Sequence, residues 1–507
     1  MADRRVVAGV LGGLLVLALA AGCGVIKPPS SVSSSAVAGS PTPTAEPVPD
    51  GFVTLDASLL KGATTATLNA PEAHVVAKVP QLAGLTALNL AVQVVRDREL
   101  RAFAKAGGTD FASDWVPIAA TNNLLGVLST TKVTDKAGVA QTMPIAFYFD
   151  GTANQVYTSP ALIEATHWDA FGTLLRTAIA ASSTKIDPTK AAAALKEPSA
   201  AMGNGPAMGF TAKGDFVVAF ASGIVNGTQD MVSVTIPSAD IEPVLSSLGR
   251  RVRGGVTHPS PFDPASAKTG TAVTIPLVAT GTRPSADVVP DCAKLQCVAL
   301  TFDDGPAPRT QEVVNYFRDA GAAATFFQLG DMINSKEGPA RVLATAASGM
   351  QIGSHTWRHK AMATEKVAVV TDQVSKNASA LAAITGDQTI FMRPPYGSHN
   401  KASDAVAHDA GEVVALWSVD TLDWKTRNTQ ATIASASASK SGDVVLMHDI
   451  HDPTVAAVKQ TIANLQSAGF TLVTMAELAS PGDWTAGNTY CAAPARKMSC
   501  GSAQYTP

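Results

Sequence analysis

Five short segments in the second half of the chain contain residue types that bind metal ions and transfer protons. They read TFDDGP (301–306), HTWRH (355–359), RPPYG (393–397), DTLDW (420–424) and LMH (446–448). The first segment places two aspartates side by side where an apolar run ends. Asp, Gly and Pro are also common in ordinary turns, so the other segments decide between a turn and a reactive site.

These segments lie in a region where strand-like and helix-like stretches alternate. From about residue 291, apolar runs such as CVALTFD are followed by helical stretches, many of which end at Gly. This alternation is typical of parallel strands joined by helical crossovers. Roughly seven or eight such units in about 190 residues favour a distorted, closed (β/α) barrel. An open doubly wound sheet is the structural alternative. No GxGxxG or P-loop motif follows any strand, so nucleotide chemistry has no support.

The polar residues share one position in this pattern, because each follows a predicted strand. They are Asp303 and Asp304 after the first strand, His355 after the third, Arg393 and Tyr396 after the fourth, Asp420 to Trp424 after the fifth, and His448 after the sixth. Active sites of (β/α) barrels lie at the carboxyl ends of the strands. The sequence therefore predicts that these side chains meet in one site.

A metal site is the first prediction. His355 and His359 are four residues apart and can share one ion in a helical or tightly turned segment. Two imidazoles and one carboxylate form a known ligand set for a hydrolytic metal. Either Asp303 or Asp304 could supply the carboxylate, while its neighbour accepts a proton from water. Zinc suits this set best, and cobalt or manganese are alternatives.

The remaining residues suit proton delivery and charge stabilisation. His448 can be cationic near neutral pH and protonate a leaving group, and Asp420 or Asp423 could orient it. Arg393 can keep a carboxylate base ionised. The main-chain N–H of Tyr396, which follows two prolines, can donate to a developing oxyanion. Trp424 offers a flat face to a sugar ring, or is an ordinary aromatic at the rim.

In order and strand position, these motifs resemble those of NodB-type polysaccharide deacetylases, which form carbohydrate esterase family four. The resemblance covers residues 291 to about 480 and implies a metal-dependent hydrolase that removes N-acetyl groups from a glycan. It also implies a role for each residue. Asp303 is the base, Arg393 is its tether, and the metal ligands are Asp304, His355 and His359. His448 is the acid, with Asp423 in preference to Asp420 as the carboxylate beside it; the Tyr396 N–H is the oxyanion donor, and the substrate contacts are Leu446, Pro395 and Trp424.

The N-terminal half predicts a separate domain. Residues 51–285 mix strand-like stretches such as MPIAFYF with the helix-like DAFGTLLRTAIAA, without regular alternation, which is typical of an α+β domain. The segment FYFDGTANQVYTSPALI resembles the α+β domain of some anti-sigma factors and of some peptidoglycan deacetylases, which implies contact with the cell wall. Residues 481–507 are expected to form a C-terminal tail.

The N-terminus predicts export. Arg4 and Arg5 precede an apolar stretch and LALAAGC, so residues 1–22 are typical of a signal peptide. LALAAGC resembles a bacterial lipobox, which implies lipidation of Cys23; a plain secretory signal is the alternative. Residues 23–50, rich in Ser and Pro, are expected to form a tether. The other four cysteines suggest two local disulfides, Cys292–Cys297 and Cys491–Cys500.

The net charge and the predicted export restrict the substrates and partners that this chain could have. A net charge of −3 excludes a basic surface for nucleic acid. With a lipid anchor as its only membrane attachment, an exported protein would meet peptidoglycan as its acetylated glycan substrate. Two alternatives are an esterase acting on O-acetyl groups of a xylan-like glycan, and a non-catalytic lipoprotein that binds or senses the wall.

Overall fold

The computed structural model describes residues 47–198, 202–203, 205–266 and 283–500. The predicted signal peptide, most of the predicted tether and Cys23 lie outside the described residues. Residues 45–507 form one compact unit. No helix among the described residues has the length and apolar character needed to cross a membrane.

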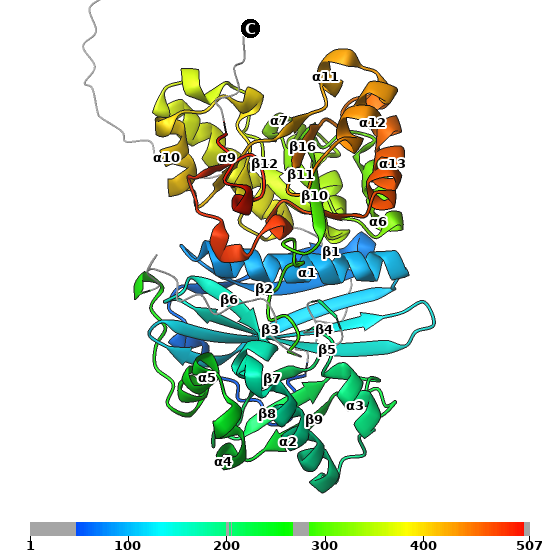
Figure 1. The fold of residues 1–507 in the computed structure, drawn as a ribbon. Coiled ribbons are helices and arrows are strands. Elements are labelled where there is room, and N and C mark those ends of the chain that lie inside the picture. Colours follow the sequence, from blue (N-terminus) through cyan, green and yellow to red (C-terminus); the bar gives the residue numbers. More distant parts are fainter. Residues whose placement is uncertain (1–46, 199–201, 204, 267–282, 501–507) are drawn as a thin grey trace, which may run out of the picture. The chain divides into compact units, whose positions relative to one another are not determined.

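The N-terminal half is built on a six-stranded sheet in the order β1-β2-β3-β4-β5-β6 (Figure 1). Its pairs are antiparallel except β2–β3, which is parallel because helix α1 forms the crossover between them. The bounds are β1 Ala63–Ala70, β2 Val75–Leu82, α1 Thr86–Ala106, β3 Asp110–Thr121, β4 Leu124–Thr134, β5 Ala140–Asp150 and β6 Gln155–Thr158.

A second, antiparallel sheet of three strands follows in the order β7-β8-β9. Its core includes Phe216, which packs edge-on against Phe171 of helix α2. The bounds are α2 Trp168–Ala181, α3 Pro188–Ala194, β7 Ala207–Phe210, β8 Phe216–Phe220, β9 Val232–Ile236, α4 Ser238–Ile241 and α5 Ser247–Thr257. The described residues between 51 and 285 therefore have the predicted α+β character.

The C-terminal half contains a curled parallel sheet with the order β15-β16-β10-β11-β12-β13-β14-β18, and β17 pairs with the first half of β10. Its strands are β10 Gln296–Gly305, β11 Thr325–Gln328, β12 Gln351–Ser354, β13 Phe391–Met392, β14 Val413–Ala415, β15 Val419–Asp420, β16 Val444–Met447, β17 Phe470–Val473 and β18 Thr489–Tyr490. The predicted distorted barrel is confirmed.

Helices connect these strands and pack around them (Figure 1). They are α6 Thr310–Ala320, α7 Gly330–Ile333, α8 Gly338–Ala347, α9 Val367–Thr385, α10 Lys401–Asp409, α11 Asp423–Thr426, α12 Thr429–Ser437 and α13 Asp452–Ser467. Helix α6 shows why the sequence folds this way: its apolar residues Val313, Val314 and Phe317 are buried against the sheet, and Gly321 ends it in the left-handed conformation.

The barrel has a seam within residues 413–420, an apolar run that forms two short strands. The first, β14, pairs with β13, and the second, β15, pairs with β16 at the other end of the sheet. Only residues 416–418 separate them. The path of paired strands among the described residues does not join β14 to β15. Residues 416–418 therefore span the gap between these two strands as a single chain segment, and β18 pairs with β14 next to the gap.

Helix α1 packs against the C-terminal half through apolar and charged contacts. Leu88, Val92 and Val95 share a core cluster with Phe391 of β13 and Val413 of β14. These contacts make the two halves parts of one packed unit.

The charged contacts of α1 centre on a buried carboxylate. Glu477 lies in the short helix η9 (Ala476–Leu478), and its side chain is 2% exposed. Its Oε1 accepts hydrogen bonds from Arg98, over 2.9 Å, and from Arg101. Its Oε2 accepts from the main-chain N–H of Thr474 over 2.9 Å. Both arginines belong to α1, so Glu477 ties that helix to the barrel.

Both predicted disulfides are confirmed. Cys292 is bonded to Cys297, immediately before and at the start of β10, and Cys491 is bonded to Cys500 near the C-terminus. Each links residues that are close in sequence, as the local pairing predicts.

Candidate functional site

A bulge in strand β10 explains how two adjacent aspartates face one site. Asp303 is paired with Phe327 and Gly305 with Gln328, so Asp304 is the extra residue in the register. Asp304 has a φ of 70°, in the left-handed region. Successive side chains of a regular strand point to opposite faces, and the bulge re-aims Asp304. Both carboxylates can therefore serve the same site.

Asp304, His355 and His359 come together as the sequence predicts. Their ligand atoms all lie within 4.8 Å of one another. The Nε2 atoms of His355 and His359 are 3.3 and 3.1 Å from Oδ1 of Asp304. The histidines follow β12 in a turn rather than a helix, and His359 has a φ of 51°. Such backbone strain is typical of functional sites.

The hydrogen bonds of this cluster fit a divalent metal ion. Nδ1 of His355 lies 2.8 Å from the carbonyl oxygen of Arg393, so Nδ1 carries the proton and the lone pair of Nε2 faces Asp304. Oδ1 of Asp304 is buried and accepts no hydrogen bond from the described residues. A cation bound between these atoms would satisfy the facing lone pairs. Two imidazoles and a carboxylate suit zinc and similar ions.

Arg393 holds the other aspartate. Its side chain is fully buried, and Nη1 donates to Oδ1 of Asp303 over 2.8 Å and to the Thr301 hydroxyl over 2.7 Å. Nε and Nη2 donate to the carbonyl oxygens of Ala415 and Leu416, over 3.2 and 2.9 Å. Arg393 is thus the ion-pair partner of this nearly buried carboxylate, and Oδ2 of Asp303 lies 3.9 Å from Nε2 of His355. Asp303 is therefore fixed beside the cluster of Asp304, His355 and His359.

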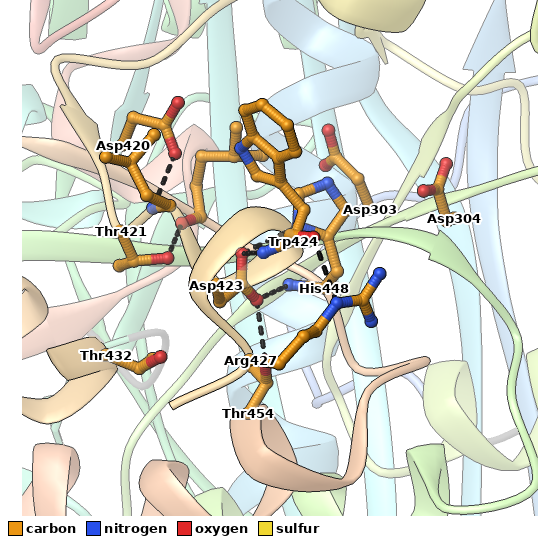
Figure 2. A network of polar contacts seen from close by, with 12 residues as sticks. Asp303, Asp304, Asp420, Thr421, Asp423, Trp424, Arg427, Thr432, His448 and Thr454 are labelled. Carbon is orange, nitrogen blue, oxygen red and sulfur yellow. Dashed lines mark hydrogen bonds and ion pairs between the residues drawn. The ribbon is translucent and has the colours of Figure 1, made fainter. Parts of the chain in front are cut away.

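His448 follows strand β16, which pairs with β10 on the side opposite β11. Figure 2 shows its side chain beside Asp423. Its Nδ1 is 2.9 Å from Oδ1 of Asp423, and its main-chain N–H donates to Oδ2 of Asp423 over 2.7 Å. The Thr454 hydroxyl donates to the same Oδ2 over 2.7 Å. Asp420 instead accepts from the main-chain N–H of Leu422. Asp423 is therefore the carboxylate that orients His448.

These contacts set the charge of His448. Burial lowers its pKa, but the hydrogen bond and charge of Asp423, with further contributions from Asp303 and Asp304, outweigh burial and raise the pKa to about 9. The imidazole is therefore cationic at neutral pH, with its Nε2–H available to a substrate. The site therefore holds carboxylates at the end of β10 and an imidazolium after the neighbouring strand β16.

The predicted substrate contacts lie around this pair. Leu446 precedes His448 by two residues on β16 and is buried, so it shares its face of the strand. Pro395 is buried, Tyr396 has a φ of 62°, and its ring meets that of His359 at 4.5 Å. The Trp424 side chain is 44% exposed. An exposed indole at the rim is available to a bound ligand.

Sequence reasoning missed three residues that support the site. Thr301 contacts Arg393 and lies two residues before Asp303, so strand alternation could have identified it. The Phe327 ring lies 4.1 Å from the Arg393 guanidinium carbon. Thr454 contacts Asp423 from the first turn of α13, and no motif indicates it.

Comparison with known proteins is consistent with this geometry. Residues 291–415 match the family model described as polysaccharide deacetylase. The chain is 38% identical over 203 residues to peptidoglycan-N-acetylglucosamine deacetylase PgdA of Listeria monocytogenes, covering 38% of this chain and 42% of that protein. It is 33% identical over 184 residues to peptidoglycan-N-acetylmuramic acid deacetylase PdaC of Bacillus subtilis, covering 36% of this chain and 38% of that protein.

A third relative is named for two activities. The bifunctional xylanase/deacetylase of Pseudobutyrivibrio xylanivorans is 31% identical over 185 residues, covering 36% of this chain and 30% of that protein. The chain thus spans less than half the length of each of these three relatives. The matched segment begins just before β10 and includes Asp303, Asp304, His355, His359 and Arg393. The C-terminal half of the chain therefore carries a domain of the polysaccharide deacetylase family.

Proposed function

We propose that this protein is a metal-dependent hydrolase that removes N-acetyl groups from a cell-surface polysaccharide, with the amino sugars of peptidoglycan as substrate. One observation carries the proposal. The Asp303–Arg393 pair and the His448–Asp423 pair flank the Asp304, His355 and His359 cluster at the carboxyl ends of one parallel sheet. A base, an acid and a metal-ligand set at one point are what amide hydrolysis requires.

The residues divide the reaction as follows. Asp303, held by Arg393, accepts a proton from the attacking water. The main-chain N–H of Tyr396 donates to the oxyanion that forms on the acetyl carbon. Nε2 of His448 then protonates the sugar nitrogen as the bond to the acetyl carbon breaks, which releases acetate and a free amine. Trp424 supports the sugar ring, and Leu446 and Pro395 enclose the acetyl methyl group.

Asp304, His355 and His359 would hold the metal, and zinc is the ion that the proposal assigns. The bound ion supplies positive charge that polarises the acetyl carbonyl and acidifies water. Asp303 stays outside the ligand set because its Oδ1 is occupied by Arg393. Its remaining oxygen is thereby left for proton transfer.

Treatment with a chelator is expected to abolish acetate release, and added zinc is expected to restore it. The test substrate is purified peptidoglycan glycan, with acetate measured enzymatically and the glycan products identified by mass spectrometry. Cobalt and manganese in place of zinc would identify the ion that supports the highest rate. Acetate release that survives removal of the metal, verified by elemental analysis, would contradict the metal assignment.

Activity is expected to fall as the pH rises through about 9, because His448 must carry a proton and its pKa is raised to about 9. The acid form predominates below that pH, so the loss lies on the alkaline side. Replacement of Asp423 by Asn removes the charge that raises this pKa, and the alkaline limb of kcat/KM should move to lower pH. An unmoved limb in Asp423→Asn would show that another group titrates there.

A second candidate is hydrolysis of O-acetyl esters on a xylan-like glycan. The relative named as a bifunctional xylanase/deacetylase favours it, and the same base, acid and metal set can cleave an ester. Side-by-side assays of acetylated xylan and N-acetylated glycan separate the two. Tight glycan binding without acetate release from either substrate would instead favour the wall-binding lipoprotein.

We further propose export and attachment to the membrane by a lipid on Cys23, facing the wall. The support is the apolar stretch and LALAAGC segment of the N-terminus. In cells, Cys23→Ala is expected to release the protein from the membrane fraction. Equal membrane retention of both forms would contradict the lipid anchor.

A further inference from the structure

The turn that follows Asp304 is enclosed by buried polar side chains that the mechanism above does not use. They are Gln328 at the end of β11, Thr310 at the start of α6, and Asp449, the residue after His448. Each is no more than 1% exposed. None is a proposed metal ligand, base or acid, so polar groups this deep in the interior need another explanation.

Asp449 reaches this turn through Thr310. The Thr310 hydroxyl donates a hydrogen bond to Oδ2 of Asp449 and accepts one from the main-chain N–H of Ala307 over 2.8 Å. Ala307 is the third residue after Asp304. The chain beyond the bulge is therefore tied to the segment that carries His448.

The second oxygen of Asp449 faces Gly305. A Cβ atom on Gly305 would lie 3.0 Å from Oδ1 of Asp449 and 3.3 Å from Oε1 of Gln328, so any side chain there would press on both residues. Oδ1 of Asp449 and both polar atoms of the Gln328 amide are buried and have no hydrogen-bond partner among the described residues. With its amide turned end for end, Gln328 would present Nε2 to the same side of Gly305. Gly305 is therefore enclosed by polar groups that are closely packed against it.

Asp304 has a conformation that needs such support. It is the extra residue of the bulge and has a φ of 70°. A residue other than glycine keeps this strained conformation only where its surroundings fix it. Gly305 and Ala307, the points that Asp449 and Thr310 contact, follow Asp304 directly in the chain.

We propose that Asp449 is a positioning residue for the metal site. Acting through Thr310 and against Gly305, it holds the bulge in the conformation that directs the Asp304 carboxylate toward the two histidines. This rests on the proposed function, in which Asp304 is a metal ligand. Because Asp449 directly follows His448, the same side chain also fixes the spacing between the metal ligands and the acid.

Asp449→Ala is expected to weaken zinc binding at least about ten-fold, as residues that orient metal ligands typically do when replaced. The dissociation constant is measured on the folded protein by competition with a chromophoric chelator. Asp449→Asn keeps an oxygen that accepts from Thr310 and should bind zinc as the unsubstituted protein does. Asp452→Ala is the matched control, because it removes a carboxylate that is 84% exposed on the same segment and should leave zinc affinity unchanged.

Thr310→Val tests the route and also serves if Asp449→Ala does not fold. It removes the hydroxyl that joins Asp449 to Ala307, so it should weaken zinc binding as well. The double variant should lose no more affinity than the weaker-binding single variant, since both changes break one connection. Losses that add would overturn the inference, because the two residues would then act separately.

Unchanged zinc affinity in the folded Asp449→Ala and Thr310→Val variants, with only a lower melting temperature, would overturn the inference, because these residues would then serve stability alone. An equal loss in Asp449→Asn or in Asp452→Ala would overturn it too, because charge rather than the hydrogen bond to Thr310 would be responsible. Absence of zinc binding in the unsubstituted protein would contradict the metal assignment of the proposed function, and this inference would fall with it.

Discussion

Asp303→Asn is expected to lower the rate of acetate release by about 10²- to 10⁴-fold while metal binding persists. The asparagine keeps the size of the side chain and can still accept the hydrogen bond from Arg393, but its amide does not take a proton from water. The proposed metal ligands Asp304, His355 and His359 are unchanged. The measurements are kcat on N-acetylated glycan and metal content after dialysis.

The matched control is Asp304→Asn, one residue along the same bulge. It replaces the carboxylate oxygen that both histidines face, so it should lose metal as well as activity. Comparison of the two variants therefore distinguishes a loss of proton transfer from a loss of metal binding at adjacent residues. Near-normal turnover in Asp303→Asn, or metal loss in that variant, would contradict the division of roles.

Glu477→Ala is expected to lower the free energy of unfolding by about 3–5 kcal/mol, because it leaves two arginines without their buried partner. Arg98 and Arg101 of α1 both donate to this carboxylate, whose side chain is 2% exposed. Chemical denaturation at neutral pH measures the change. Glu72→Ala, at an exposed position of the N-terminal half, is the control and should change stability by no more than about 0.5 kcal/mol.

The Glu477 carboxylate also makes the free energy of unfolding depend on pH in the acidic range. Burial raises the pKa of Glu477, but Arg101 and Arg98 outweigh burial and lower it from 4.5 to about 2. Because the folded value is below the unfolded one, the contribution is complete above pH 4.5 and is lost as the pH falls toward 2. The difference corresponds to about 3 kcal/mol. An unfolding free energy with the same acid dependence in Glu477→Ala would show that this carboxylate does not carry the effect.

The barrel and its reactive residues could be predicted because the signals are local. Each polar motif directly follows an apolar run, so the order of strands and helices already places Asp303, His355, Arg393 and His448 at one end of the sheet. The choice of Asp423 over Asp420 needed the family resemblance in addition, since both lie in the same short segment. The structure shows a contact to His448 from Asp423.

Other features depend on pairing between distant segments and left no local signal. The bulge at Asp304 is a property of its register with β11. Helix α1 was not recognised because it is buried on several sides and includes the buried polar residues Asn89, Arg96 and Asp97, so it lacks the one-sided pattern of a surface helix. The split of residues 413–420 into β14 and β15 follows from their pairing with different strands, β13 and β16, which no periodicity encodes.

The seam of the barrel gives Arg393 a second duty. Its guanidinium reaches Thr301 and Asp303 of β10 and also the carbonyl oxygens of Ala415 and Leu416, where the chain leaves β14 for the gap. One side chain therefore connects β10 to the segment that leaves β14 and also holds Asp303, the proposed base. Loop replacements on this scaffold would have to preserve these hydrogen bonds, because their loss would disturb the barrel wall and the proposed base together.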